Sequence, residues 1–441
     1  MKIALLSDTH ANLPALRAVI AHARRQNVDA FWHLGDSVGY SPFPRETIAF
    51  LRQVCDKQIV GNYDLKVLSP VFIRKLKRLK KDPDKVFSFV WTRRALSDED
   101  RAFLSGLPRV LRVRIDGKRI LMTHGSPRGI EDPLTPWSAI FRLREIAREA
   151  KADLVLCGHT HRAFERRVGR TLFVNPGGVG RSFDGDPRAS YAVLDIRKKK
   201  ISVEPFRVRY DAKPLVREMR DRGFPSRLID SLTRARSLDD LQTTPDARRK
   251  GTLHAARRLA HRCPGSQGHF EQVRRLALSL FDGLYPGDTF ARERFWLEMA
   301  AILHDVGMAQ GVAGHHKASR DIILGARGLP VSDEERRIIA LVARYHRRGL
   351  PRTGHAYYRD LSFVQQEIVA ALAAILRVAD GLDRTHRSAV REVHVHRKME
   401  DWTLDVWVRG EGVEEQKAAL RKGDLWGQVW GNLAVRLRSG K

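Results

Sequence analysis

Cysteine is scarce in this chain: the 441 residues contain three, Cys55, Cys157 and Cys263, and no Cys-x-x-Cys pair. Such a distribution excludes a disulfide framework and a thiolate zinc site. Apolar runs are short as well, because none approaches the roughly 18 residues of a membrane-spanning helix. The first residues also lack the charged region and cleavage site of a signal peptide. We therefore expect no membrane span and a reducing, cytoplasmic location.

Acidic residues are too few to balance the basic ones. The chain has 51 Asp and Glu against 80 Lys and Arg, a net charge of +29. This excess favours anionic partners such as nucleic acid, nucleotides, polyphosphate or a phospholipid surface. An arginine-rich proteome would produce the same composition, so the charge does not choose among these partners. The length is that of about three domains, enough to bury sizeable cores.

Short apolar strands alternate with amphipathic helices over residues 1 to about 207, and several of these strands end in side chains that bind metals. The first strand, Ile3 to Leu6, runs directly into Ser7-Asp8-Thr9-His10. Each such cluster alone is weak evidence, but their recurrence at strand ends makes coincidence a poor explanation. The later clusters are Gly35-Asp36, Gly61-Asn62-Tyr63-Asp64, Thr123-His124-Gly125 and Gly158-His159-Thr160-His161.

The side chains in these clusters form a set of oxygen and nitrogen ligands without sulfur, which suits Mn, Fe, Ni or Zn. Seven ligands are too many for one ion and suit two ions bridged by a carboxylate. Two such ions about 3.5–4 Å apart hold a phosphate, generate hydroxide, and stabilise the attacking and leaving oxygens. Adjacent glycines let the backbone turn tightly and the phosphate approach. The candidate ligands are Asp8, His10, Asp36, Asn62, His124, His159 and His161.

Together these clusters resemble the calcineurin-like metallophosphoesterase superfamily, and most of all its small bacterial and archaeal phosphodiesterases. The likeness covers residues 1–207, and 175–180 and 185–191 add to it. It implies a four-layer α/β/β/α sandwich with two divalent metals at the strand ends. Asp36 would bridge the metals, and Asp36, Asn62 and His124 would act in catalysis. The resemblance implies one metal on Asp8, His10, Asp36 and His161, and the other on Asp36, Asn62, His124 and His159.

Tyr63 departs from the pattern of the superfamily, in which many members have a histidine after the asparagine. That histidine helps to protonate the leaving group and holds the phosphate. A phenol with a pKa near 10 donates a hydrogen bond but is a poor proton shuttle at pH 7. Tyr63 is therefore predicted to contact the substrate, and the departure favours phosphodiesters with good leaving groups.

After a linker predicted at 209–247, the sequence changes to long helices with few strands. This character indicates an α-helical domain over 248–390. Alternating apolar residues from Val393 to Val408 then predict a β-hairpin. Two further helices, Val413–Leu420 and Leu425–Leu437, complete a predicted α+β extension over 391–441. We expect the tryptophans of this extension to lie in its core: Trp402, Trp407, Trp426 and Trp430.

The helical domain contains His269, His304-Asp305 and Asp380 in an order that resembles the HD-domain phosphohydrolase superfamily. The surrounding residues resemble the C-terminal domain of exopolyphosphatase/guanosine pentaphosphate phosphatase proteins. The resemblance implies one or two divalent metals. Met308 stands where many active HD enzymes have a phosphate-contacting lysine, and Lys317 and Arg347 are candidates to supply that charge. The implied ligands are His269, His304, Asp305 and Asp380, with His316 and His346 added in two-metal members.

The sequence thus predicts a two-metal phosphodiesterase that uses a metal-bridging hydroxide. Its C-terminal HD-like module would hydrolyse or sense a nucleotide or polyphosphate. Two alternatives stay open: a nucleic-acid-processing phosphodiesterase or nuclease, and a phosphoesterase regulated by a non-catalytic, ligand-binding HD domain. A homodimer is compatible with each of them.

Overall fold

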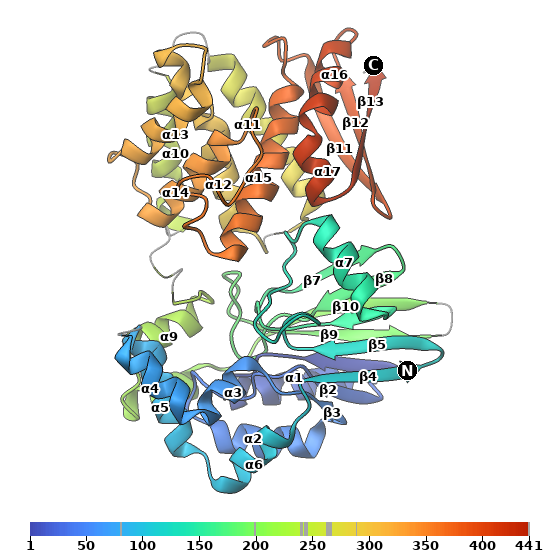
Figure 1. Cartoon of the computed structure of the whole chain (residues 1–441), viewed down its shortest axis with the longest axis vertical. Helices are drawn as coiled ribbons and strands as arrows, with labels where there is room; N and C mark the ends of the chain where they lie inside the picture. The colour runs from blue at the N-terminus through green and yellow to red at the C-terminus, as the bar shows by residue number, and fades with distance from the viewer. Residues whose placement is uncertain are drawn as a thin grey trace. The chain divides into compact units, whose positions relative to one another are not determined.

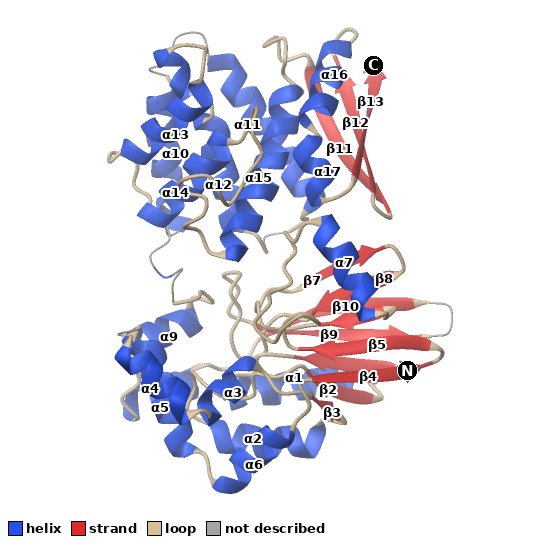
Figure 2. Ribbon diagram, viewed as in Figure 1, coloured by secondary structure: helices blue, strands red, loops and turns tan. Residues whose placement is uncertain are grey.

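The computed structural model describes residues 1–79, 82–197, 200–238, 241, 246–261, 267–287 and 289–439 (Figures 1 and 2). Cys263 lies outside these ranges. The chain divides into two compact units, one of Met1–Pro136 and Arg144–Leu241, the other of Trp137–Leu143 and Gln242–Lys441. Within the described ranges, no helix combines the length and apolar character that a membrane crossing requires.

The first unit is built on two five-stranded sheets. One has the strand order β10-β9-β1-β2-β3, and the other has the order β4-β5-β6-β8-β7. In each sheet the central strands are parallel: β1 with β2, and β5 with β6 and β8. The strands are β1 (Lys2–Leu6), β2 (Ala30–His33), β3 (Lys57–Gln58), β4 (Val110–Ile115), β5 (Lys118–Thr123), β6 (Leu154–Leu156), β7 (Phe164–Val168), β8 (Thr171–Asn175), β9 (Ala189–Ile196) and β10 (Ile201–Val208).

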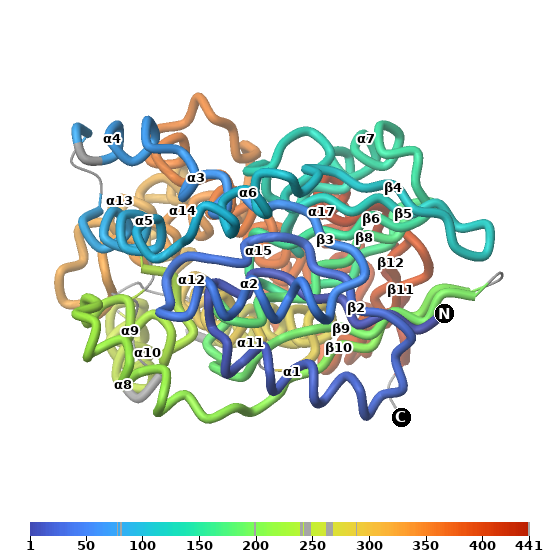
Figure 3. Tube along the Cα trace, turned by 90° about the horizontal axis from the view of Figure 1, so that it is seen from below, coloured from blue at the N-terminus to red at the C-terminus, as the bar shows by residue number. Residues whose placement is uncertain are grey.

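The sheets pack face to face because side chains alternate along each strand. Ile3 and Leu5 of β1 join a buried cluster with Met122 of β5 and Leu156 of β6. The alternate residues of β1 pack instead against the first helix, so that α1 and α2 cover the outer face of this sheet (Figure 3). The predicted hairpin around Asp116-Gly117 is confirmed, since β4 and β5 pair antiparallel on either side of it.

The helices of the first unit extend beyond the predicted domain boundary. α8 and α9, which fall in the predicted linker, belong to this unit and share an apolar cluster with Tyr40. The helices are α1 (Leu13–Arg25), α2 (Pro44–Val54), α3 (Asn62–Leu68), α4 (Pro70–Arg78), α5 (Pro83–Ala95), α6 (Asp98–Gly106), α7 (Ile140–Ala150, which begins in the second unit), α8 (Lys213–Asp221) and α9 (Ser226–Thr233).

The second unit is a helical body around one buried core. Trp137, encoded within the first half of the sequence, lies in this core against Phe281, Tyr285 and Phe290. Ser332 and Ser362 cap α14 and α15 with capping boxes, which fix where these helices begin. The elements are α10 (Asp246–Ala260), α11 (Gln267–Leu284), α12 (Ala291–Leu303), the 3-10 helix η2 (Val306–Gln310), α13 (His315–Gly325), α14 (Asp333–Arg344) and α15 (Phe363–Gly381).

The C-terminal part has a three-stranded sheet beside two helices. The predicted hairpin is confirmed as β11 (Val390–Lys398) and β12 (Asp401–Val408). Helices α16 (Val413–Lys422) and α17 (Asp424–Val429) follow. The predicted helix Leu425–Leu437 is wrong beyond Val429, because Asn432–Ser439 forms β13, parallel to β12.

Tertiary packing explains this difference. Leu433, Val435 and Leu437 alternate along β13, a two-residue period that places them on one face of the sheet against the core. Gly431, with a φ of 109°, breaks the chain between α17 and β13. Three of the four predicted core tryptophans are buried: Trp402, Trp426 and Trp430. Trp407 is half-buried and contacts His394.

Candidate metal centres

The predicted ligands of the first unit lie beyond the carboxyl ends of four parallel strands. β1 leads to Asp8 and His10, and β2 leads to Asp36. In the second sheet, β5 leads to His124, and β6 leads to His159 and His161. Parallel strands present their carboxyl ends at one edge of a sheet, which is where open α/β sheets bind ligands. Asn62 completes the set from the first residue of α3.

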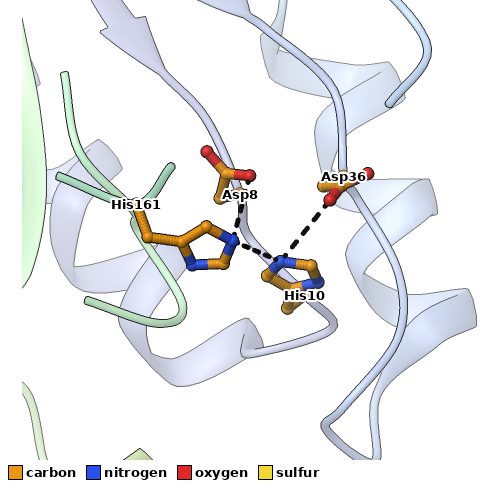
Figure 4. A group of neighbouring side chains, drawn as sticks. All are labelled: Asp8, His10, Asp36 and His161. Atoms are coloured by element: carbon orange, nitrogen blue, oxygen red, sulfur yellow. Dashed lines mark hydrogen bonds and ion pairs between the residues drawn. The ribbon is translucent and has the colours of Figure 1, made fainter. Parts of the chain in front are cut away.

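Four of these side chains form the first group, Asp8, His10, Asp36 and His161, whose ligand atoms all lie within 4.8 Å of one another (Figure 4). His161 Nε2 is 3.3 Å from Asp8 Oδ1 and 3.2 Å from His10 Nε2. His10 Nε2 in turn is 3.7 Å from Asp36 Oδ2. The four side chains are buried, so they face one another and not the solvent.

The second group shares Asp36 with the first. His124 Nε2 is 3.4 Å from Asp36 Oδ2, the oxygen that also faces His10. The Asn62 amide lies 2.9 Å from His124 Nε2, 3.0 Å from His159 Nδ1 and 3.2 Å from Asp36 Oδ2. With its nitrogen turned to these atoms, the amide donates to them. With its oxygen turned the same way, Asn62 would be a metal ligand.

Three of the histidines have their orientation fixed by backbone carbonyls. Nδ1 of His10 lies 3.1 Å from the Val38 oxygen, and Nδ1 of His124 lies 2.7 Å from that of Leu34. Nδ1 of His161 lies 2.7 Å from the oxygen of Arg181. Each ring thereby donates from Nδ1 and turns Nε2 toward the centre, where its lone pair can bind a cation once the ring is neutral. This is the arrangement that holds metal-binding histidines in position.

The electrostatics of the first unit fit cations at both groups. Burial lowers the pKa of His10 to about 3 and that of His159 to about 4, so both rings are neutral, as metal binding requires. Burial raises the pKa of Asp8 to about 7. Asp8 Oδ1 is buried without a hydrogen-bond partner among the described residues. A divalent cation would satisfy this oxygen.

The backbone around the ligands is strained. Asp8, His10, Asp36, His159 and His161 all have φ between 48° and 67°, the left-handed region that non-glycine residues rarely adopt. Each such residue costs on the order of 1–3 kcal/mol. Strain of this kind persists where the surrounding fold fixes it, and it concentrates here on five of the seven predicted ligands. The fold thus holds the ligand positions before any ion binds.

Metal uptake by the first unit should be linked to proton release. Burial would lower the pKa of His124, but the Asp36 carboxylate raises it to about 9. In the metal-free protein at pH 7, His124 is therefore protonated, and burial of Asp8 raises its pKa and favours its protonated form. Since ligands must be deprotonated, metal affinity should rise as the pH increases from 7 through 9.

A titration of the metal-free protein with Mn²⁺ in weakly buffered solution at pH 7 measures this linkage. We expect release of roughly one proton from His124, with a further contribution from Asp8. Metal affinity that stays constant from pH 6 to pH 9 would contradict the assignment of these two ligands.

The second unit holds two further groups of possible ligands. One consists of His269, His304 and Asp380, and the other of Asp305, His315 and His346. Asp305 lies between them: its Oδ2 is 3.6 Å from His304 Nε2, and its Oδ1 is 3.2 Å from His315 Nε2 and 3.5 Å from His346 Nε2. The two groups therefore share a carboxylate, as those of the first unit do.

The four histidines of these groups are also oriented for metal binding. The Nδ1 atoms of His304, His315 and His346 each lie 2.7–2.9 Å from a backbone carbonyl oxygen three residues earlier. Nδ1 of His269 lies 2.8 Å from the Asp383 carboxylate. His269 Nε2, His304 Nε2 and Asp305 Oδ1 are buried without hydrogen-bond partners in the described part of the chain. These donors fit one or two divalent cations.

The structure places two of the predicted residues of the second unit differently from the others. His316 is predicted as a ligand together with His346, whereas the group around Asp305 contains His315 and His346. α13 begins at His315, and adjacent helical residues point about 100° apart, so only one of the pair faces the group. Lys317 is exposed at the start of α13. Arg347, by contrast, lies 3.4 Å from the His315 ring.

Some residues at the sites escaped the sequence analysis. Asp383, which orients His269, stands in the same Asp-x-x-Asp stretch as Asp380, a spacing that could have indicated it. Lys422, ion-paired with Asp380, lies 42 residues further on, and no local pattern marks it. In the first unit, Tyr40 shares a hydrogen bond with Tyr63 through their hydroxyl groups, and Arg181 lies 3.5 Å from the Tyr40 ring centroid.

Comparisons with known proteins agree with this division. Residues 1–199 match the family described as the calcineurin-like phosphoesterase superfamily domain, and residues 254–425 match Ppx/GppA phosphatase, domain III. Over 226 residues the chain is 29% identical to the uncharacterized protein MJ0912 of Methanocaldococcus jannaschii, covering 48% of this chain and 88% of that protein. The phosphodiesterase MJ0936 of the same organism is 27% identical over 199 residues, covering 45% and 95%. A solved structure, the metallophosphoesterase from Sphaerobacter thermophilus, is 30% identical with a TM-score of 0.45, covering 53% of this chain and 100% of that one.

The paired ligand groups, the matched phosphoesterase family and the phosphodiesterase relative define the class: the protein is a metal-dependent phosphoester hydrolase. More narrowly, residues 1–199 form a calcineurin-like phosphoesterase domain of metallophosphoesterase α/β type. The second unit contains a Ppx/GppA domain III over 254–425, helical with a small sheet.

Proposed function

We propose that the first unit is a two-metal phosphodiesterase. The observation that carries the proposal is the position of Asp36 Oδ2, which faces His10 of the first group and His124 of the second. A carboxylate shared in this way suits a bridge between two cations. We further propose the full α/β/β/α layering for this unit, with α7 outside the second sheet, where the Ala150 carbonyl accepts a hydrogen bond from Arg112 of β4.

The candidate ligands of the first unit would bind two cations. Asp8, His10 and His161 would hold one cation, and Asn62, His124 and His159 the other, with Asp36 common to both. These residues would hold two cations, whose chemistry there would be Lewis acidity and activation of a water for attack on phosphorus. The protein contributes fixed ring tautomers and buried carboxylates, which would hold the cations in place for the diester to bind between them.

Tyr63 supports a preference for diesters. Its backbone nitrogen donates to Asp36 Oδ1 at 2.7 Å, and its ring lies edge-on to His10, with centroids 5.2 Å apart. Its hydroxyl group is engaged with Tyr40. A phenol held in this way can donate a hydrogen bond but exchanges protons poorly at pH 7. Esters with good leaving groups need no such proton transfer.

A comparison of two chromogenic esters tests the proposed diesterase activity. With Mn²⁺ present, turnover of bis-p-nitrophenyl phosphate should exceed that of p-nitrophenyl phosphate, although both esters release p-nitrophenolate. Replacement of Tyr63 by His should raise turnover of diesters with poor leaving groups, such as an alkyl alcohol, by about tenfold or more, the usual contribution of a general acid. Equal turnover of both esters by the wild-type protein would overturn the preference for diesters.

For the second unit we propose an HD-type module that binds divalent metals and, through them, the phosphates of a nucleotide or polyphosphate. The two groups that share Asp305, with Arg347 beside His315, support this role. The matched Ppx/GppA domain III points to the same class of ligand. The leading prediction includes both hydrolysis and sensing of that ligand by the module, whereas in the regulatory alternative the module binds the ligand without hydrolysing it.

Replacement of Asp305 by alanine distinguishes the contribution of the second unit from that of the first. Because its two oxygens face both groups, the variant should lose all metal bound by the second unit while keeping wild-type hydrolysis of bis-p-nitrophenyl phosphate. Metal content by mass spectrometry and initial rates measure these effects. Asp321→Ala is the control, since Asp321 lies on α13 in an exposed ion pair with Arg320. A large loss of diesterase activity in Asp305→Ala would show that the chemistry is not confined to the first unit.

A further inference from the structure

Asp380 uses its two carboxylate oxygens differently. Oδ1 faces the first group of the second unit, 3.4 Å from His269 Nε2. Oδ2 is ion-paired with the ammonium group of Lys422, the last residue of α16. Burial would raise the pKa of Asp380, but Lys422 is the main influence that holds it well below its usual range. The C-terminal extension thus places the ammonium group of a lysine directly beside the ligand groups of the second unit.

The fold fixes where Lys422 lies. Arg377, one turn before Asp380 on α15, is buried, and its Nε donates to the Lys422 carbonyl at 3.1 Å. The same guanidinium makes two hydrogen bonds of 2.9 Å to Asp424, just beyond Lys422. Such a bidentate pair is geometrically specific. Lys422 is therefore anchored at its backbone, and its side chain is only 20% exposed.

A close approach of two helices strengthens this anchoring. A Cβ atom on Gly381 would lie 2.7 Å from both the Cα and the nitrogen of Ala419. Only glycine at position 381 lets α15 and α16 approach this closely. The residue that follows Asp380 thus sets the distance to the helix that carries Lys422. The ion pair is a product of the packing and not a chance contact of a flexible surface lysine.

The charge at this site indicates what Lys422 does. Asp305, Asp380 and Asp383 supply the carboxylates around the two groups. Two divalent cations would exceed the charge of these carboxylates even before Lys422 is counted. An ammonium group here opposes metal binding and attracts an anion. If Lys422 only held Asp380 in place, its removal would disorder Asp380 and weaken metal binding. If its charge opposes metal binding, its removal leaves metal binding equal or stronger.

We propose that Lys422 is an anion-binding residue of the second unit: it pairs with Asp380 in the metal-free protein and with ligand phosphate once metals neutralise Asp380. This inference rests on the proposed function of the second unit and names the residue that takes its ligand. Lys422 would then supply, beside the ligand groups, the phosphate-contacting lysine that many HD enzymes have at the position of Met308. The phosphates of nucleotides and of polyphosphate share the chemistry that Lys422 would recognise.

Two binding measurements on the full chain test the proposal. The first is the affinity for Mn²⁺ at the sites that Asp305→Ala abolishes. The second is the affinity of the Mn²⁺-saturated protein for methylenediphosphonate, a non-hydrolysable diphosphate, measured by titration calorimetry. Only the binding that is present in the wild type and absent in Asp305→Ala is assigned to the second unit. Lys422→Met should bind methylenediphosphonate roughly ten- to a hundredfold more weakly, the effect of one lost charged hydrogen bond. It should bind Mn²⁺ at least as tightly as the wild type.

Two further variants keep the test selective. Lys422→Arg retains the charge and should bind the diphosphonate nearly as well as the wild type. Lys417→Met, at an exposed position on the same helix, should change neither affinity. Unchanged diphosphonate binding by Lys422→Met, or weaker Mn²⁺ binding, would overturn the inference alone. No Asp305-dependent Mn²⁺ site in the wild-type protein would overturn the proposed function of the second unit and the inference with it.

Discussion

Asp36→Asn should reduce kcat/KM for bis-p-nitrophenyl phosphate by at least roughly a thousandfold, the loss expected when metal-based charge stabilisation of several kcal/mol is removed. Asp36 is buried between the two groups, and its Oδ2 lies 3.7 Å from His10 Nε2 and 3.4 Å from His124 Nε2. An amide carries no charge to hold two cations near each other. The metal content of the first unit should therefore fall together with its activity.

Asp195→Asn is a matched control for this prediction. Asp195 lies on β9 of the same unit and pairs with Arg197 at the surface. The control should keep full activity and full metal content. Wild-type phosphodiesterase activity in Asp36→Asn would place the chemistry outside the groups described for the first unit, and the proposed function would fail.

Most candidate ligands of the first unit could be predicted from the sequence because they follow strands that are apolar and short; Asn62, after the polar strand Lys57–Gln58, is the exception. Leu6, Leu34 and Leu156 mark strands buried in the sandwich, and polar residues begin where each strand leaves it. Parallel pairing then brings the ends of β1 and β2 together, and likewise those of β5 and β6. The division into two groups depends on which atoms meet across the sheets. The sequence predicts that division only through its resemblance to the calcineurin-like metallophosphoesterases.

The second unit was harder to predict because helices place ligands by their rotation and their ends. The choice between His315 and His316 turns on the residue at which α13 begins, and Gly314 in the left-handed region sets that point. Lys422 and Trp137 lie far along the sequence from the residues that they contact, and no periodic pattern connects them with Asp380 or Phe281. Contacts at such separations arise from tertiary packing, which local propensity does not encode.

Gly61→Ala should destabilise the first unit by about 3 kcal/mol or more and remove its metal binding. A Cβ atom at position 61 would lie 2.0 Å from the Asp36 nitrogen and 2.1 Å from Asp36 Oδ1. The backbone at Asp36 cannot yield cheaply, since Asp36 already adopts a φ of 57°. Overpacking of a buried site typically costs about 1–3 kcal/mol, and a clash with backbone atoms belongs at the upper end or beyond it.

Thermal unfolding and Mn²⁺ titration of the variant measure the two effects. For a unit of this size, a loss of about 3 kcal/mol lowers Tm by roughly 6–12 °C. Gly106→Ala provides the comparison, because a Cβ atom there meets nothing within 4 Å, at the end of α6, and alanine should be neutral or slightly stabilising. If Gly61→Ala unfolded at the wild-type temperature and bound Mn²⁺ normally, the chain at 61 would not press against Asp36. The close approach that holds the shared carboxylate between its two groups would then have another cause.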